Sequence, residues 1–165
     1  MALCLPVTRL DEELCDELAA LARAAAEDHA GPFDATWQAS QGWVRQVMPA
    51  LGQGRALWCA RDQGRLVGCV QLVRDDVPGN RHRGWVEALL EAPEKEGAIA
   101  GQLLAMLELF AGFDGCQLLM CLAPSVTLEK MLDGRQWQCA GKLPGYHIPL
   151  HGPAEPAGLY YKSLV

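Results

Sequence analysis

The chain has 165 residues, with 14 basic and 20 acidic side chains, and its formal net charge is −6 at neutral pH. Half of the residues are hydrophobic and 21% are charged, a balance typical of a globular domain and not of a disordered chain. The acidic balance disfavours nucleic acid and anionic membranes as partners. The length predicts a single domain over residues 1–165.

The seven cysteines are an odd number and contain no CxxC pair. Most lie within apolar runs, where a thiol behaves as a small hydrophobe, so we predict a reducing, cytoplasmic setting. Cys116, Cys121, His147 and His151 match no compact zinc-finger spacing, and we predict no metal. No apolar run reaches the roughly 18 residues of a membrane helix, so we also predict no membrane segment.

Two helices are predicted in the first third of the chain. Apolar residues recur at helical spacing over residues 10–26, and acidic residues occupy the first turn, where the helix dipole favours them. A second helix is predicted over residues 34–48, ended by Pro49 and the glycines that follow. Residues 3–7 are a candidate for a first strand.

Strands follow in the middle of the chain. The short apolar runs 56–61 and 66–73 are joined by Asp-Gln-Gly-Arg at 62–65, which predicts a β-hairpin. Residues 84–91 are a further strand, ended by Ala-Pro.

In the last third of the chain, the helical and the strand spacing of apolar residues alternate. Residues 97–110 form a helical pattern, and the apolar run 116–122 predicts a strand buried on both faces. A short helix follows from Ser125, a plausible N-cap, to about residue 133, with Gly134 as a plausible C-cap. Strands at 136–141 and 158–164 complete one mixed α/β domain.

Two strings carry a resemblance to a known superfamily. The strand at 84–91 ends in LLEAP, and the turn E-G-A-I-A-G at 96–101 leads into a helix. Near the end, G-K-L-P-G-Y at 141–146 is followed by L-Y-Y-K-S-L at 159–164. With the order of elements, these strings resemble the GNAT superfamily, whose turn reads R-G-x-G-x-G/A, and within it the branch that includes the tabtoxin resistance protein. The resemblance covers about residues 55–164.

The resemblance implies the GNAT acyl-CoA N-acyltransferase fold, a twisted mixed sheet flanked by helices and splayed between its fourth and fifth strands. It implies acetyl-CoA as co-substrate and the amine of a small molecule as acceptor. A homodimer is left open.

The glycine-containing turn would present the unpaired N–H groups of a helix N-terminus to the pyrophosphate of acetyl-CoA. The strand before it would offer backbone groups to the pantetheine arm. The predicted cofactor-binding residues are therefore Leu89, Leu90, Glu91, Gly97, Ala98, Ile99, Ala100, Gly101 and Gln102.

Two residues are candidates for catalysis. GNAT enzymes often carry a carboxylate at the strand position of Glu87, where it deprotonates the acceptor amine, because an ammonium group has no lone pair for attack. Tyr146 is a candidate for the acceptor pocket, or for the acid that protonates the leaving thiolate. The structural alternatives are a solvent-facing strand residue for Glu87 and an aromatic that closes a hairpin for Tyr146.

Three residues depart from the superfamily pattern. Glu96 stands where the family has arginine, Ile99 where it has glycine, and Leu132 where it commonly has the tyrosine acid. A carboxylate repels phosphate, and isoleucine resists a positive φ and crowds the turn. Three hypotheses therefore stay open: an active N-acetyltransferase, a catalytically impaired protein that binds acyl-CoA or a partner as a regulator, and an interaction protein that has lost the cofactor.

Overall fold

A seven-stranded mixed sheet runs through the molecule, in the order β1-β2-β3-β4-β5-β7-β6. The computed structural model describes residues 2–27, 42–45, 51–148 and 152–165. Neighbouring strands are antiparallel except β4 and β5, which are parallel. This confirms the predicted α/β class. The strands are β1 (Leu3–Pro6), β2 (Arg55–Asp62), β3 (Arg65–Arg74), β4 (Arg83–Glu91), β5 (Leu118–Ala123), β6 (Gln138–His147) and β7 (Glu155–Ser163).

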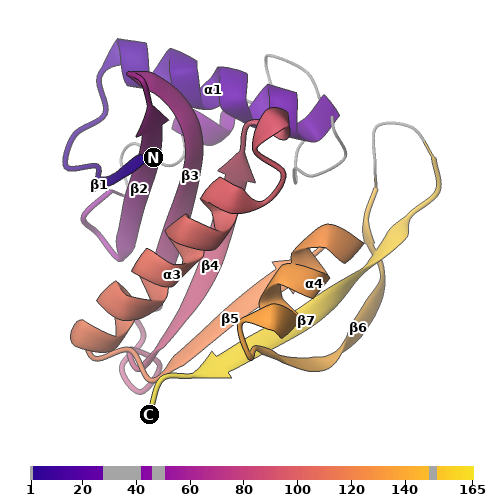
Figure 1. Cartoon of the computed structure of the whole chain (residues 1–165). Helices are drawn as coiled ribbons and strands as arrows, with labels where there is room; N and C mark the ends of the chain where they lie inside the picture. Colours follow the sequence, from indigo (N-terminus) through magenta and orange to yellow (C-terminus); the bar gives the residue numbers. More distant parts are fainter. Residues whose placement is uncertain (1, 28–41, 46–50, 149–151) are drawn as a thin grey trace.

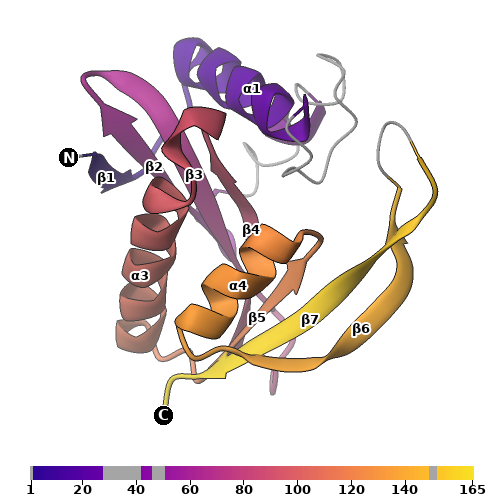
Figure 2. The ribbon, with the colours of Figure 1, turned by 45° about the vertical axis from the view of Figure 1, so that its right-hand side comes forward.

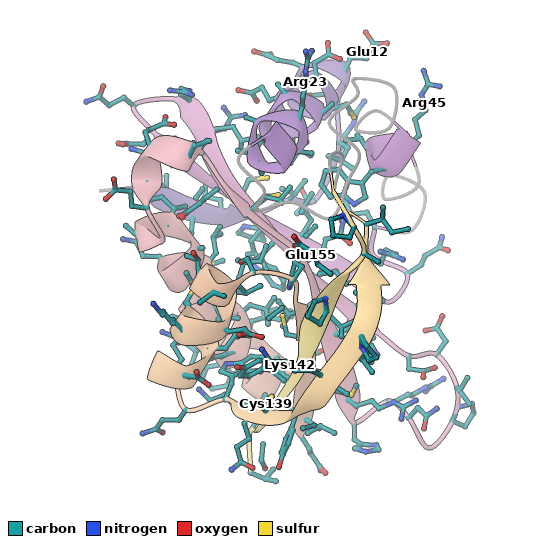
Figure 3. All side chains as sticks on the ribbon, turned by 90° about the vertical axis from the view of Figure 1, so that its right-hand side faces the viewer. Glu12, Arg23, Arg45, Cys139, Lys142 and Glu155 are labelled. Carbon is teal, nitrogen blue, oxygen red and sulfur yellow. The ribbon has the colours of Figure 1, made fainter. Side chains whose placement is uncertain are left out.

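Helices cover both faces of the sheet. α3 (Ala98–Phe113) and α4 (Val126–Gly134) lie on one face, and α1 (Glu12–Glu27) packs against β3 and β4 on the other (Figures 1 and 2). Figure 3 shows Glu12 and Arg23 of α1 at one end of the molecule, with Cys139 and Lys142 of β6 towards the other. Residues 42–45 are helical, and the rest of the second helix predicted over 34–48 lies outside the described residues.

The predicted β2–β3 hairpin is confirmed. Asp62 and Arg65 are paired across a two-residue turn, and the turn residues Gln63 and Gly64 have φ of 51° and 84°. Two positive φ angles characterise the tight turn whose twist matches that of the flanking strands. The turn sequence therefore also sets the register of this hairpin.

The packing of α3 brings its first turn close to the sheet. Leu103, Leu104 and Leu107 are fully buried, as the helical pattern predicts. A Cβ atom placed on Gly68 of β3 would lie 2.6 Å from Ile99 Cγ2, so this glycine permits the close approach.

The last third differs from the prediction in the burial of one strand and in the bounds of several elements. β5 is not buried on both faces, because its residues alternate between buried (Leu119, Cys121, Ala123) and half-buried. β6 extends to His147 and includes Pro144, which an edge strand tolerates because its outer N–H groups need no partner. α4 ends with Gly134 as its last helical residue, one position beyond the prediction.

The sheet splays between β4 and β5. These strands are paired only from Arg83–Leu118 to Val86–Cys121, and the rest of β4 diverges from β5 (Figure 1). A bulge at Ala88, whose φ is 47°, accompanies the divergence, since Glu87 pairs with Gln71 and Leu90 with Cys69. The predicted splay is confirmed, and it leaves one edge of β4 without a strand beside it over residues 87–91 in the described part of the chain.

Candidate active site

A pocket of about 500 Å³ lies where the two strands diverge. The end of β4, the start of α3 and the start of α4 form its walls, with Ala25 of α1 at one side. Of the predicted cofactor-binding residues, Leu89, Leu90, Glu91, Gly97 and Ala100 line it, and Ala98, Ile99, Gly101 and Gln102 do not. The remaining lining residues are Pro93, Glu96, Ser125, Thr127, Leu128 and Met131.

The carboxylate of Glu91 caps the N-terminus of α3. It accepts hydrogen bonds from the backbone N–H groups of Gly97, Ile99 (3.1 Å) and Ala100 (3.0 Å). The first N–H groups of a helix have no partner within the helix, and the helix dipole favours a negative charge there. This helix start therefore holds an oxyanion, in this case one that the chain itself supplies. The sequence pattern points only to the backbone of Glu91 as part of the site and gives no signal for this role of its side chain.

The expected crowding by Ile99 is wrong. Its side chain is 5% exposed, packs over Gly68 and does not line the pocket. The positive φ angles of the turn fall instead on Glu96 (51°) and Gly97 (92°), so Ile99 meets no backbone restriction. Glu96 does line the pocket and adds a second carboxylate to its wall.

The start of α4 forms the opposite wall, which the sequence analysis did not identify. Ser125 accepts a hydrogen bond from the Leu128 N–H at 3.2 Å, which confirms it as the N-cap, and Thr127, Leu128 and Met131 line the pocket. Leu132 is fully buried in the core and not in the pocket wall. Two helix N-termini therefore border one pocket, and both favour an anion by their dipoles.

Glu87 lies on the sheet surface outside this pocket. Arg55 of β2 places Nη1 3.0 Å from Gln71 Oε1 and 3.4 Å from Glu87 Oε2. The side chains of Arg55 and Glu87 are 32% and 48% exposed, so their ion pair contributes about 0–1 kcal/mol to stability. Gln71, between them on β3, is fully buried.

Tyr146 lies on β6 and is 53% exposed. It does not line the pocket. The structure therefore brings Glu87 together with Arg55 and Gln71.

The buried thiols have no features of nucleophiles. Burial raises the pKa of Cys121 to about 12, and burial together with the charge of Cys59 raises the pKa of Cys69 well above its ordinary value. A thiol needs a lowered pKa to react as the thiolate. No disulfide joins any of the seven cysteines, all of which lie within the described residues. None of the described helices is both long and apolar enough to span a membrane.

No protein-family model matches the sequence, and no curated protein is significantly similar to it. Solved structures do match. A putative acetyltransferase from Salmonella typhimurium, determined with acetyl-CoA, is 11% identical with a TM-score of 0.81 and covers 100% of this chain and 95% of its own. A ribosomal-protein-alanine N-acetyltransferase from Brucella melitensis is 17% identical with a TM-score of 0.79, covering 96% and 99%.

A GNAT-family acetyltransferase from Streptococcus pneumoniae is 13% identical with a TM-score of 0.72, and the match covers 98% of this chain and 99% of that one. These matches extend over almost the whole of each chain. The chain has the fold of the GNAT acetyltransferases.

Proposed function

We propose that the protein is an N-acetyltransferase that transfers the acetyl group of acetyl-CoA to the amine of a small molecule. The observation that carries this proposal is the pocket at the splay of β4 and β5, bordered by a helix start that holds an oxyanion. In the fold of the acetyltransferases, such a pocket suits a thioester with a pyrophosphate in its chain. The strings at 141–146 and 159–164 support the branch of the tabtoxin resistance protein, and the continuous sheet supports a single domain.

Acetyl-CoA fits the groups that the pocket offers. The unpaired edge of β4 at Leu89–Glu91 would hold the pantetheine arm by backbone hydrogen bonds, and the N–H groups of Gly97, Ile99 and Ala100 would hold the pyrophosphate. The pyrophosphate can take these N–H groups only if the Glu91 carboxylate leaves them. Cofactor binding therefore includes the displacement of a side chain of the protein.

The reaction needs a neutral amine. In the proposed step, Glu87 removes a proton from the acceptor ammonium, directly or through water, and the nitrogen lone pair attacks the thioester carbonyl carbon. A backbone N–H on the Leu89–Glu91 strand would stabilise the oxyanion that forms. The nitrogen loses its second proton to solvent as the carbon–sulfur bond breaks, which leaves a neutral amide, and the CoA thiolate takes up a proton from solvent or from Tyr146.

A protein that binds acyl-CoA without catalysis is the second candidate. Glu91 and Glu96 place two carboxylates in the pocket wall, and Tyr146 does not line the pocket. Leu132, at the position where the superfamily commonly has a tyrosine, has no proton to donate to the thiolate. A weakly bound cofactor and a slow leaving step would both result. This observation favours a regulatory role that depends on acetyl-CoA. In this second proposal the protein acts in the cytoplasm, as a monomer or as a homodimer.

The proposed function is tested by calorimetric titration with acetyl-CoA, followed by a pH–rate profile of thiol release with a panel of small amines. We expect Glu87→Gln to lower the rate about a hundredfold below the pKa of the acceptor amine, where the base is needed, and less above it. Tyr146→Phe should lower the rate by a smaller factor. Binding of acetyl-CoA without turnover of any amine would favour the regulatory role, and no binding would overturn both.

A further inference from the structure

Three polar side chains meet on the α1 face of the sheet, outside the pocket. Arg55, Gln71 and Glu87 come from the adjacent strands β2, β3 and β4, and the register places Gln71 directly beside Glu87. The Arg55 guanidinium bridges the other two, as described above. A cation and an anion are thus presented side by side, with an amide between them.

The amide of Gln71 is only half satisfied. Its Oε1 accepts from Arg55, but its Nε2 is buried and finds no acceptor among the described residues. Buried polar groups in native proteins are almost always paired, so an unpaired buried donor points to an acceptor atom that the described residues do not supply. The donors at this cluster, on Arg55 and Gln71, suit the two oxygens of a carboxylate.

The charge of Arg55 also limits what Glu87 can bind. A guanidinium 3.4 Å from the carboxylate repels a simple ammonium that approaches Glu87, and repels a polycation more strongly. An acceptor that carries its own carboxylate reverses this effect, because the carboxylate pairs with Arg55 while the ammonium pairs with Glu87. The Arg55–Glu87 pair is partly exposed and contributes little to stability, so it exchanges its partners easily.

We propose that Arg55, Gln71 and Glu87 form an acceptor subsite that selects an α-amino acid. Such an acceptor carries its ammonium and carboxylate on one carbon, which matches the side-by-side charges of Glu87 and Arg55. Arg55 and Gln71 hold the carboxylate, and Glu87 holds the ammonium and accepts its proton. This inference rests on the proposed acetyl transfer for its catalytic part, whereas the binding part depends only on the three side chains.

The experiment compares matched ligands. Each of the common α-amino acids is paired with its amide, which keeps the shape and loses the negative charge, and with the amine that remains after removal of the carboxylate. Thiol release from acetyl-CoA gives kcat and KM for each, and calorimetry gives the affinity of each ligand without any reaction. We expect at least one amino acid to exceed its amide and its amine by about tenfold or more in kcat/KM and in affinity.

The variants separate this selectivity from general damage. Arg55→Gln should raise KM for the amino acid about tenfold with little change for the amide, and Arg55→Lys should restore part of the difference. Gln71→Leu should also raise KM for the amino acid and leave KM for the amide nearly unchanged. Arg81→Gln makes the same change of charge on the exposed β3–β4 loop and is the matched control. It should change the KM of neither the amino acid nor its amide.

Each outcome decides one of the two proposals. Amino-acid binding that depends on Arg55, without turnover, supports the subsite and contradicts the acetyl transfer. The subsite is overturned if amides and simple amines are turned over as fast as the amino acids. It is also overturned if no amino acid binds.

Discussion

Glu108 of α3 joins the loop between α4 and β6 to the end of β7. Its carboxylate accepts from Arg135, Lys162 at 2.8 Å and Trp137 Nε1 at 2.8 Å. Burial alone would raise the pKa of Glu108, but these hydrogen bonds and the charge of Arg135 together hold that pKa below its ordinary value. A single residue of α3 thus joins segments that follow it by 27 to 54 positions in the chain.

We expect Glu108→Gln to lower the free energy of unfolding by about 1–3 kcal/mol at pH 7, because hydrogen bonds to a charged group are lost. A lowered folded-state pKa means that this stabilisation is present above the unfolded pKa, near 4.5, and is lost as the pH falls through the folded value. Urea unfolding at pH 7, 5 and 3 should therefore show a difference between wild type and variant that shrinks towards acid.

Glu129→Gln is the matched control for this experiment. Glu129 forms an ion pair with the exposed Lys142, so its substitution should lower the free energy of unfolding by only about 0–1 kcal/mol. An equal effect of Glu108→Gln at all three pH values would show that the charge of Glu108 is not what stabilises this region.

At the scale of elements, the start of α3 combines a structural role with a proposed functional one. We expect Glu91→Gln to tighten the binding of acetyl-CoA about tenfold, near 1.4 kcal/mol, because the pyrophosphate no longer has to displace a carboxylate. The same variant should lower the free energy of unfolding by about 0.3–1 kcal/mol, since the helix loses a favourable charge at its N-terminus. Titration calorimetry and urea unfolding measure the two effects.

Glu94→Gln provides the comparison, because Glu94 lies in the same turn, in the short helix η2 (Pro93–Lys95), but pairs with Arg65 and does not line the pocket. It should leave the affinity for acetyl-CoA nearly unchanged. If Glu91→Gln binds acetyl-CoA no more tightly than wild type, the pyrophosphate does not use these N–H groups.

The contact between α3 and β3 leads to a prediction about packing. Gly68→Ala would place a methyl group 2.6 Å from Ile99 Cγ2 and 3.1 Å from the Leu90 carbonyl oxygen, so we expect a loss of about 1–3 kcal/mol in the free energy of unfolding. Combining it with Ile99→Ala should cost less than the sum of the two single changes, because the clash is removed. Urea unfolding of the four proteins in this cycle measures the coupling.

Gly112→Ala is the matched control for Gly68→Ala, because Gly112 lies on α3 with open space around it. This change should stabilise the protein by up to about 1 kcal/mol.

If the effects of Gly68→Ala and Ile99→Ala on the free energy of unfolding are additive, the two residues do not meet.

At the scale of the whole molecule, the sheet consists of two halves that share only a short parallel pairing between β4 and β5. The first half carries α1 and α3, and the second carries α4 (Figure 2). The candidate pocket lies where these halves separate, and the polar cluster of Arg55, Gln71 and Glu87 lies on the first half. The two proposed binding sites thus depend on β4, whose bulge at Ala88 separates Glu87 from the pocket residues Leu89 and Leu90.

Local chemistry let the sequence predict most of this architecture. The Asp-Gln-Gly-Arg turn predicts its hairpin because glycine accepts a positive φ, and Ser125 predicts the start of α4 because its hydroxyl accepts from a free N–H. The alternation of strand and helical periods predicts the element order, and with the resemblance it predicts the splay. The predicted β6 ends too early, because Pro144 and Gly145 indicate a turn locally, whereas an edge strand tolerates them.

The sequence by itself determined the class of fold and the position of the turn that leads into α3, and it proposed Glu87 as a candidate base. Only the tertiary structure decided which side chains meet. It directs Ile99 into the core over Gly68, brings the Glu91 carboxylate to the start of α3, and places Arg55 beside Glu87 across two strand pairings. The physical reason is that propensity and periodicity act over a few neighbouring residues, whereas these contacts depend on strand register and on the angle at which a helix crosses the sheet.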